Sequence, residues 1–269
     1  MRHLRHSTWS VVALLLLGCE EKAPPATDSH VLPATSAQAL AVVPASAVAP
    51  SPKPEAPAEK AKEERSASEC PEGNVVDFPN ADFEAAVRKK LEKPEGDITK
   101  AELAKLRSLN VSQTRMAALD VCVFPLMTGL KELFLGPGKY TDLSAIAGAT
   151  QLESLRASQN KVSDLTPLSK MTKLDRLDLG QTEVSDLTAL ADLVNLTELM
   201  LDGTHVSDVT PLAKMTKLER VGLANTKVKD ISPLGAAKKL KFVYVAGTPA
   251  AEDMNFAAVT KNGTKVTTE

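Results

Sequence analysis

The sequence contains few of the residues from which enzyme active sites and nucleic-acid-binding surfaces are usually built. Its 269 residues include four histidines and three cysteines, and of the histidines only His205 lies after residue 30. A Ser/His/Asp triad or a His/Cys metal site therefore has almost no candidates, and no glycine-rich phosphate loop is present. The formal net charge of -2 offers no basic field, so we expect no nucleic-acid partner.

The chain also lacks a hydrophobic run long enough to cross a membrane as a mature helix. Residues 9–17 are apolar and follow two arginines, which fits a cleaved signal peptide at residues 1–18. The segment Leu16-Leu17-Gly18-Cys19 resembles the lipobox of bacterial lipoproteins, in which the cysteine becomes the lipidated first residue. An ordinary secretory signal with a coincidental cysteine is the alternative. The resemblance implies that acyl chains on Cys19 anchor the protein to a membrane of the bacterial envelope.

The next segment, residues 19–69, combines Cys19 with a stretch that is poor in core-forming side chains. Its residues 20–68 include 13 alanines and 8 prolines, with no glycine and no aromatic residue. This composition predicts a disordered linker with an end-to-end distance of roughly 40 Å. Glu20 replaces the aspartate that retains many lipoproteins in the inner membrane, so the resemblance favours the outer membrane. Both the periplasmic and the surface face of that membrane are compatible with this sequence.

What the sequence does contain is a 22-residue repeat. Each unit opens with the phrase Leu-x-x-Leu/Val-x-Leu/Ala/Val, at Leu130, Leu152, Leu174, Leu196, Leu218 and Leu240. Apolar residues alternate with polar ones in this phrase, as in a strand with one buried face. One unit cannot bury its own apolar edge, so the units must stack and pair in parallel. We therefore predict an α/β solenoid, a right-handed leucine-rich-repeat superhelix with a parallel concave sheet and about seven rungs over residues 106–248.

The two ends of the repeat region read as caps. Residues 70–105 predict a helical N-terminal cap, with a capping box at Thr99 and Glu102, and residues 249–269 predict a short C-terminal cap. Two segments precede the 22-residue repeats: Asp-Phe-Pro-Asn-Ala-Asp-Phe, which begins at residue 77, and Asp-Ile-Thr-Lys-Ala-Glu-Leu, which begins at residue 97. Together they resemble the internalin-type leucine-rich-repeat domain of bacteria. The resemblance supports the fold more than the biological role.

Two cysteines remain after Cys19. Cys70 precedes the N-terminal cap and Cys122 follows the first strand, so the two could meet at that end of the solenoid. An exported compartment permits a disulfide between them. Two separate free thiols are the alternative.

The outward positions of the strands form columns in which candidate binding residues lie. On the concave face these are Glu132, Phe134, Arg156, Arg176, Asp178, Glu198, Met200, Arg220, Phe242 and Tyr244. Exposed aromatic residues and methionine have no core to fill there, so they are the best contacts. Neighbouring strands also carry opposite charges for stability alone, and Phe242 and Tyr244 could instead pack under the C-terminal cap.

Two further columns predict structural roles. An aspartate recurs just before an inward residue of each unit, at Asp142, Asp164, Asp186, Asp208 and Asp230. Such a ladder could attract calcium, but capping of a local turn is the simpler interpretation, so we expect no metal. The other column, at a site where the internalin family usually has asparagine, contains Thr114, Gly138, Asn160, Thr182, Thr204, Thr226 and Thr248. Threonine has one donor and can replace only part of the bonding of asparagine.

These observations predict a monomeric, non-enzymatic envelope lipoprotein that binds a protein or peptide and needs no cofactor. The regular face covers about 400 Å², half of one partner's share of a standard interface, and so suits a peptide or a loop. A spacer lipoprotein without a specific ligand is the first alternative. A glycan-acting enzyme using Asp178 and Asp202 is the less favoured one.

Overall fold

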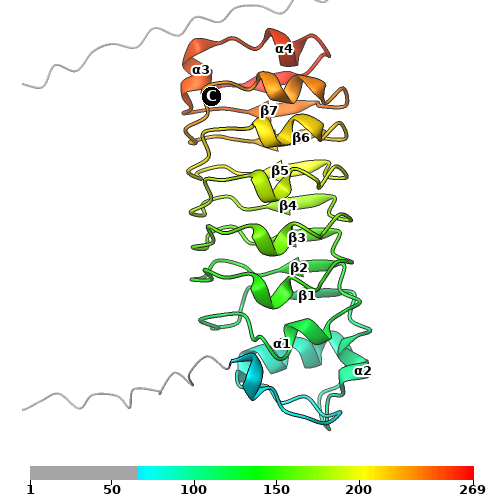
Figure 1. Ribbon diagram of the computed structural model, residues 1–269. Helices are drawn as coiled ribbons and strands as arrows, with labels where there is room; N and C mark the ends of the chain where they lie inside the picture. Colours follow the sequence, from blue (N-terminus) through cyan, green and yellow to red (C-terminus); the bar gives the residue numbers. More distant parts are fainter. Residues whose placement is uncertain (1–65) are drawn as a thin grey trace, which may run out of the picture. The chain divides into compact units, whose positions relative to one another are not determined.

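The computed structural model describes residues 66–269, and in these the repeats stack into a single continuous sheet (Figure 1). The sheet has eight parallel strands in sequence order. They are β1 (Ser108–Asn110), β2 (Glu132–Phe134), β3 (Ser154–Arg156), β4 (Arg176–Asp178), β5 (Glu198–Met200), β6 (Arg220–Gly222), β7 (Phe242–Tyr244) and β8 (Lys265–Thr267). The predicted leucine-rich-repeat solenoid is confirmed. The predicted signal peptide, the lipidation residue Cys19 and the linker up to residue 65 lie outside the described residues.

The 22-residue period sets the register of the sheet. Leu177 at the centre of β4 pairs with Leu199 of β5, and Leu199 pairs with Val221 of β6. All three side chains are at most 1% exposed. Because the strands are in register, each inward residue packs directly on its counterpart in the next rung, and the core runs through the stack without a break.

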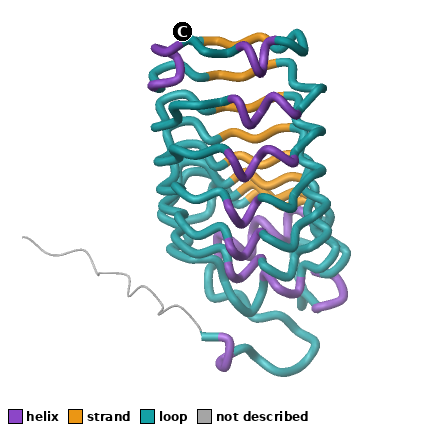
Figure 2. The backbone as a smooth tube through the Cα atoms, turned by 45° about the horizontal axis from the view of Figure 1, so that its top comes forward, coloured by secondary structure: helices purple, strands orange, loops and turns teal. Residues whose placement is uncertain are grey.

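The wall opposite the sheet consists of single turns of 3-10 helix, and Figure 2 shows these turns and the strands on opposite sides of the stack. The turns are η2 (Phe124–Leu126), η3 (Ser144–Ile146), η4 (Thr166–Leu168), η5 (Thr188–Leu190), η6 (Thr210–Lys214) and η7 (Ser232–Ala236). Four of them contain a proline in the first turn, which prevents extension into a longer helix.

The recurring aspartate precedes this turn and caps it, as the turn interpretation predicts. In one unit the backbone N–H and the hydroxyl of Thr188 donate to Asp186 Oδ1, at 2.8 and 2.6 Å. The hydroxyl hydrogen bond, followed by the backbone one, lowers the pKa of Asp186. These carboxylates are therefore occupied in local turns.

The N-terminal end is closed by η1 (Ala67–Glu69), α1 (Ala81–Leu91) and α2 (Lys100–Leu103). Asn80 accepts a hydrogen bond from the backbone N–H of Phe83 and so caps α1. The Phe83 ring stacks on that of Phe124, with centroids 5.0 Å apart. A disulfide joins Cys70 to Cys122, which settles the choice between a bridge and two free thiols. The cap is thus held to the first rung by packing and by a covalent bond.

The predicted capping box at α2 is present. Thr99 accepts a hydrogen bond from the backbone N–H of Glu102, and the Glu102 carboxylate accepts one from the backbone N–H of Thr99. Lys93 donates to the same carboxylate over 2.9 Å. The hydrogen bond from Lys93, followed by those from Thr99, lowers the pKa of Glu102 to about 2.

The C-terminal end differs from the expectation of seven rungs and a plain cap. After α3 (Pro249–Asp253) and α4 (Ala257–Thr260), the chain returns to the sheet and adds β8 parallel to β7. The Lys265 N–H donates to the Lys241 carbonyl over 2.8 Å. The final segment therefore continues the sheet as an eighth strand, although it lacks the leucine phrase.

Inside the stack, Asn160 and the threonines of its column bond differently. The Asn160 amide donates to the carbonyl of Gly136 in the preceding rung, at 2.9 Å, and its Oδ1 accepts from the Tyr140 N–H. Thr182 donates over 2.7 Å to the Leu179 carbonyl of its own rung. Asparagine thus links two rungs, whereas threonine closes a turn within one.

Candidate binding face

The outward side chains of β1 to β7 form the surface that we call the concave face. All ten candidate residues lie on it in two columns, because each occupies an outer position of its strand. The first column contains Glu132, Arg176, Glu198, Arg220 and Phe242; the second contains Phe134, Arg156, Asp178, Met200 and Tyr244. Glu132, Arg156 and Arg176 are exposed, and the other seven are half-buried. The structure thus gathers these residues on one continuous surface.

Phe134 and Arg156 form a contact at the N-terminal part of the face. The guanidinium carbon of Arg156 lies 5.9 Å from the centroid of the Phe134 ring. Such a cation–π contact holds the ring in place while leaving part of it open to solvent. The pair presents an apolar surface beside a positive charge.

A second cluster lies at the C-terminal part of the face. Arg220 donates to Glu198 Oε1 over 2.6 Å, and its guanidinium carbon lies 5.8 Å from the centroid of the Phe242 ring. The Phe242 ring stacks in turn near that of Tyr244, with centroids 6.5 Å apart. The Arg220 Nε is buried and has no hydrogen-bond partner. The ion pair between Arg220 and Glu198 balances the two charges, as pairs of opposite charge on neighbouring strands do for stability.

The C-terminal cap does not fold over the two rings. In the register of the sheet, Phe242 pairs with Lys265 and Tyr244 with Thr267, both in β8. The cap strand therefore lies beside Phe242 and Tyr244 rather than above them. Both rings remain half-buried on the concave face.

Asp202, the second carboxylate of the glycan-enzyme alternative, is half-buried and hydrogen-bonded to the next rung, which its position in the repeat does not reveal. Its Oδ1 accepts a hydrogen bond from the Ala224 N–H of the next rung, at 2.8 Å. Burial raises the pKa of Asp202, and the negative charge of Asp178 adds to this effect. A Cβ atom on Gly222 would lie 2.3 Å from Asp202 Oδ2. The glycine in the second column was the available signal that a neighbouring side chain fills this space.

Asp178 is also engaged locally, because its Oδ1 accepts a hydrogen bond from the Gly180 N–H at 3.0 Å. Both carboxylates of the glycan-enzyme alternative thus accept main-chain hydrogen bonds. Between residues 66 and 269 no three His, Cys, Asp or Glu side chains cluster closely enough to hold a metal ion.

Comparison with known proteins agrees with this architecture. The family described as "Leucine Rich repeats (2 copies)" matches residues 150–192. No curated protein matches the chain. Among solved structures, an internalin (inlF) of Listeria monocytogenes is 26% identical with a TM-score of 0.53, covering 65% of this chain and 60% of the internalin. Internalin C2 of the same species is 25% identical with a TM-score of 0.54, covering 64% of this chain and 86% of its own.

A more distant structure shares the fold alone. A leucine-rich-repeat protein of Leptospira interrogans is 16% identical with a TM-score of 0.50, covering 61% of this chain and 49% of that protein. The match thus spans less than two thirds of the inlF internalin and of the Leptospira protein. The repeat family, the parallel sheet and these neighbours agree on one conclusion: residues 66–269 have a leucine-rich-repeat fold that is similar to that of the internalins.

Proposed function

We propose that the concave face binds a protein loop or a peptide. The observation that carries this proposal is the line of part-exposed apolar side chains, Phe134, Met200, Phe242 and Tyr244, on a sheet face whose core lies on the other side. Aromatic and methionine side chains with arginine beside them form the energetic centre of many interfaces.

The dimensions of the face limit the ligand. Strands about 4.8 Å apart and three residues long give a narrow surface, about half of what one partner contributes to a standard interface. A segment lying across the strands would contact both clusters in turn. We therefore propose an extended peptide or a single loop as the ligand.

The test replaces four residues of the face by serine: Phe134, Arg156, Arg176 and Met200. We expect the variant to fold with an unchanged circular dichroism spectrum, because none of the four belongs to the buried core, and to lose its cross-linked partner in cells. The matched control replaces three exposed residues at equivalent positions on the opposite wall, Lys170, Asp192 and Lys214, and should retain the partner. Undiminished partner capture by the face variant would refute the proposal.

We further propose that the protein is anchored in the bacterial envelope, in the outer membrane, through acyl chains on Cys19. The support is the Leu-Leu-Gly-Cys resemblance and the alanine- and proline-rich segment that follows it. Between residues 66 and 269 there is no helix with the length and apolar character needed to cross a membrane. The described solenoid is the part that such an anchor would hold.

The Cys19→Ser variant tests the anchor. We expect it to move from the membrane pellet to the soluble fraction after cell fractionation, since it loses its only site of acylation. The control is Ser51→Ala, a substitution in the alanine- and proline-rich segment that leaves Cys19 and both cysteines of the disulfide in place, and it should remain in the pellet. Retention of the Cys19→Ser protein in the membrane would contradict the lipoprotein interpretation.

A spacer function without a specific ligand is the second candidate. The pairing of Arg220 with Glu198 favours it, because this contact satisfies two prominent charges of the face within the protein. Under this alternative the face variant and the control would behave alike, and no partner would be captured by either.

A further inference from the structure

We propose that the ligand of the concave face is an extended peptide with an acidic side chain that pairs with Arg156, an inference that rests on the peptide contact proposed above and specifies its chemistry. The two aromatic clusters of the face differ in one respect. Each has an arginine beside a phenylalanine ring, but only the C-terminal cluster has a carboxylate paired with its arginine. The acidic side chain of the ligand supplies the carboxylate that the N-terminal cluster lacks.

The C-terminal cluster shows the complete arrangement. Glu198, Arg220 and Phe242 occupy the same column of three consecutive strands. The Arg220 guanidinium donates to Glu198 over 2.6 Å on one side and lies 5.8 Å from the Phe242 ring centroid on the other. The positive charge of Arg220 is therefore balanced within the protein.

The N-terminal cluster has the same three kinds of side chain in reverse order, but its ion pair is not formed. Phe134, Arg156 and Asp178 occupy the second column of three consecutive strands. The Asp178 carboxylate instead accepts the N–H of Gly180 in its own turn, at 3.0 Å. Among residues 66–269, no carboxylate lies within ion-pair distance of Arg156. Arg156 is thus an exposed cation that is placed by a ring and has no ion pair.

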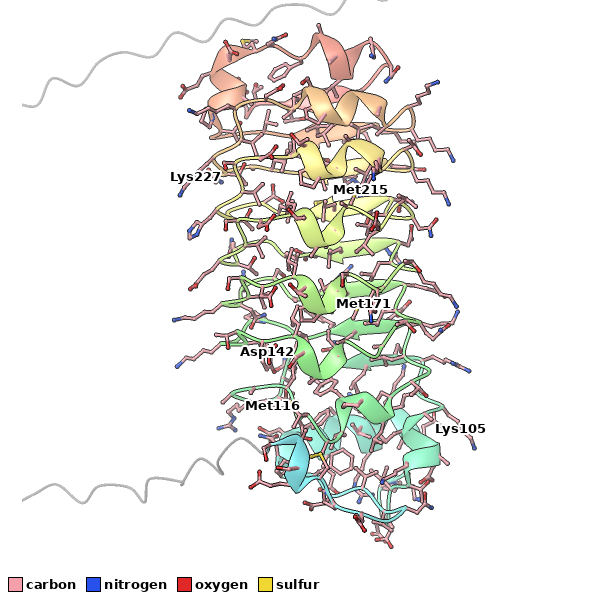
Figure 3. All side chains as sticks on the ribbon, in the orientation of Figure 1. Lys105, Met116, Asp142, Met171, Met215 and Lys227 are labelled. Carbon is pink, nitrogen blue, oxygen red and sulfur yellow. A yellow bond between two sulfur atoms is a disulfide. The ribbon has the colours of Figure 1, made fainter. Side chains whose placement is uncertain are left out.

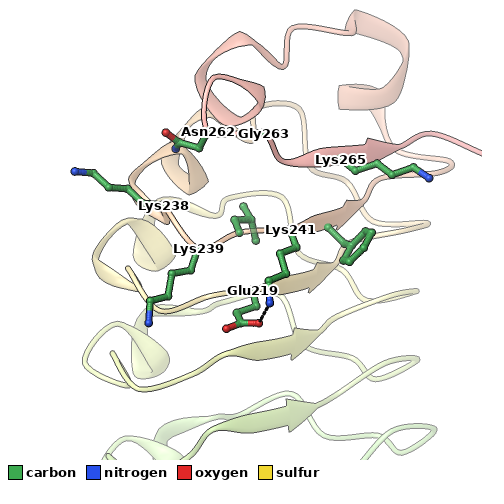
Figure 4. A pocket seen from close by; sticks show the side chains of 9 residues that line it. Glu219, Lys238, Lys239, Lys241, Asn262, Gly263 and Lys265 are labelled. Carbon is green, nitrogen blue, oxygen red and sulfur yellow. Dashed lines mark hydrogen bonds and ion pairs between the residues drawn. The ribbon is translucent and has the colours of Figure 1, made fainter.

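Elsewhere in the stack, the 22-residue spacing lets basic side chains pair with an acid one rung away. On the flank where the chain enters the strands, Lys131 pairs with Glu153 at 2.6 Å, and Lys241 pairs with Glu219 at the same distance (Figure 4). Arg156 departs from this pattern although a carboxylate stands one rung away. Its charge is therefore available to a ligand.

A carboxylate is the group that fits this position. The planar guanidinium of arginine presents N–H donors whose spacing matches the two oxygens of a carboxylate. The contact with the Phe134 ring holds the guanidinium in place, so less conformational entropy is lost on binding. Arg176 on the adjacent strand contacts only Asp175, at 4.0 Å and with both side chains about half exposed, so that pair contributes little. Arg176 therefore adds positive charge near Arg156 and favours an acidic partner.

The register of the sheet also predicts the spacing of the ligand side chains. Four strand intervals of about 4.8 Å separate β3, which carries Arg156, from β7, which carries Phe242 and Tyr244, so the two contacts lie roughly 19 Å apart. An extended peptide rises about 3.3 Å per residue. We therefore expect an acidic residue and an apolar residue separated by about six positions in the ligand.

The experiment is selection of random dodecapeptides displayed on phage against the full chain. The peptides are joined to the coat protein through their C-termini, so only a side chain can supply the carboxylate. We expect enrichment of peptides with aspartate or glutamate about six positions from an aromatic or large aliphatic residue. The Arg156→Glu variant should select lysine or arginine at the acidic position. The control is Lys227→Glu, the same charge reversal at an exposed side chain that Figure 3 shows directed away from the stack, and it should keep the acidic preference.

Calorimetric titration then measures the pairing directly, with the most enriched peptide synthesised with an amidated C-terminus. Replacing its acidic residue by the corresponding amide should weaken binding to the native protein about tenfold, since a charge-assisted contact is lost. The same replacement should change the affinity of the Arg156→Gln variant by no more than about twofold. Arg156 is exposed, so this variant should keep the native thermal midpoint.

Two kinds of failure are distinguishable. Enriched peptides that bind the concave face, and are lost with its four-serine variant, but that show no acidic preference overturn this inference and leave the proposed peptide contact in place. An equal effect of the amide replacement on the native protein and on Arg156→Gln has the same meaning. The absence of any enriched peptide that depends on the four residues overturns the peptide contact itself, and this inference with it.

Discussion

Reduction of the disulfide between Cys70 and Cys122 is expected to lower the free energy of unfolding at the N-terminal end of the solenoid by about 4 kcal/mol. The bridge closes a segment of 52 residues, and such a cross-link removes many conformations from the unfolded chain. It joins the segment before the cap to the connection after β1. The stabilisation therefore acts on the end of the stack, where a rung has only one neighbour.

Chemical denaturation with and without reductant would measure this effect, and hydrogen exchange would locate it. Protection should fall in α1, α2 and β1 and be retained in β4 to β6, because rungs in the middle are packed on both sides. A Cys70→Ala/Cys122→Ala variant is the control, since it should resemble the reduced protein and be insensitive to reductant. Equal stability of the oxidised and reduced native protein would show that packing alone holds the cap.

Replacement of Gly136 by alanine is expected to cost between about 2 and 5 kcal/mol, comparable to the loss of the disulfide. Gly136 has a φ of 72°, a left-handed conformation that L-residues seldom adopt. A Cβ atom there would lie 2.4 Å from the Cα atom of Ser112 in the preceding rung. The clash is with backbone, and the Asn160 amide also bonds to the Gly136 carbonyl. Relief would therefore require the first two rungs to separate.

Gly148→Ala is the matched control, because no atom lies within 4 Å of a Cβ built at Gly148. It should change the free energy of unfolding by no more than about 0.5 kcal/mol. Both variants are compared by urea denaturation followed by circular dichroism. If Gly136→Ala is as stable as Gly148→Ala, the close approach of the first two rungs does not limit stability.

The repeat region is the part of the fold that periodicity predicts best. A leucine every 22 residues defines the rung length, the inward positions and the parallel register, because a strand has a period of two and the rungs are equivalent. The prolines of the far wall predict its short turns. The N-terminal capping box was equally readable, since it depends on residues three apart.

The eighth strand could not be predicted in the same way. Lys265, Val266 and Thr267 have no leucine phrase, and only the open edge of β7 makes their pairing favourable.

On the concave face, too, the positions of the side chains were predictable from the sequence, whereas their contacts were not. The columns that contain the candidate residues follow from the register, so their common surface was predictable. Their contacts were not: Arg220 pairs with Glu198 and also lies over Phe242, while Arg156 lies over Phe134. The side-chain rotamer of each arginine determines which neighbour it contacts, and the 22-residue period does not specify that rotamer.

The sequence by itself determined the repeat length, the buried leucines and the surface on which a ligand would lie, because each depends on spacing along the chain. The tertiary structure decided three other matters: the pairing of Cys70 with Cys122, the burial of Asp202 over Gly222, and the pairing of β8 with the open edge of β7. These depend on contacts between the regular stack and segments that interrupt its pattern. The repeat period specifies which residues occupy equivalent positions in the rungs. The structure of the two ends of the solenoid, and of the rungs that depart from the repeat, depends on tertiary contacts between residues that are distant in sequence.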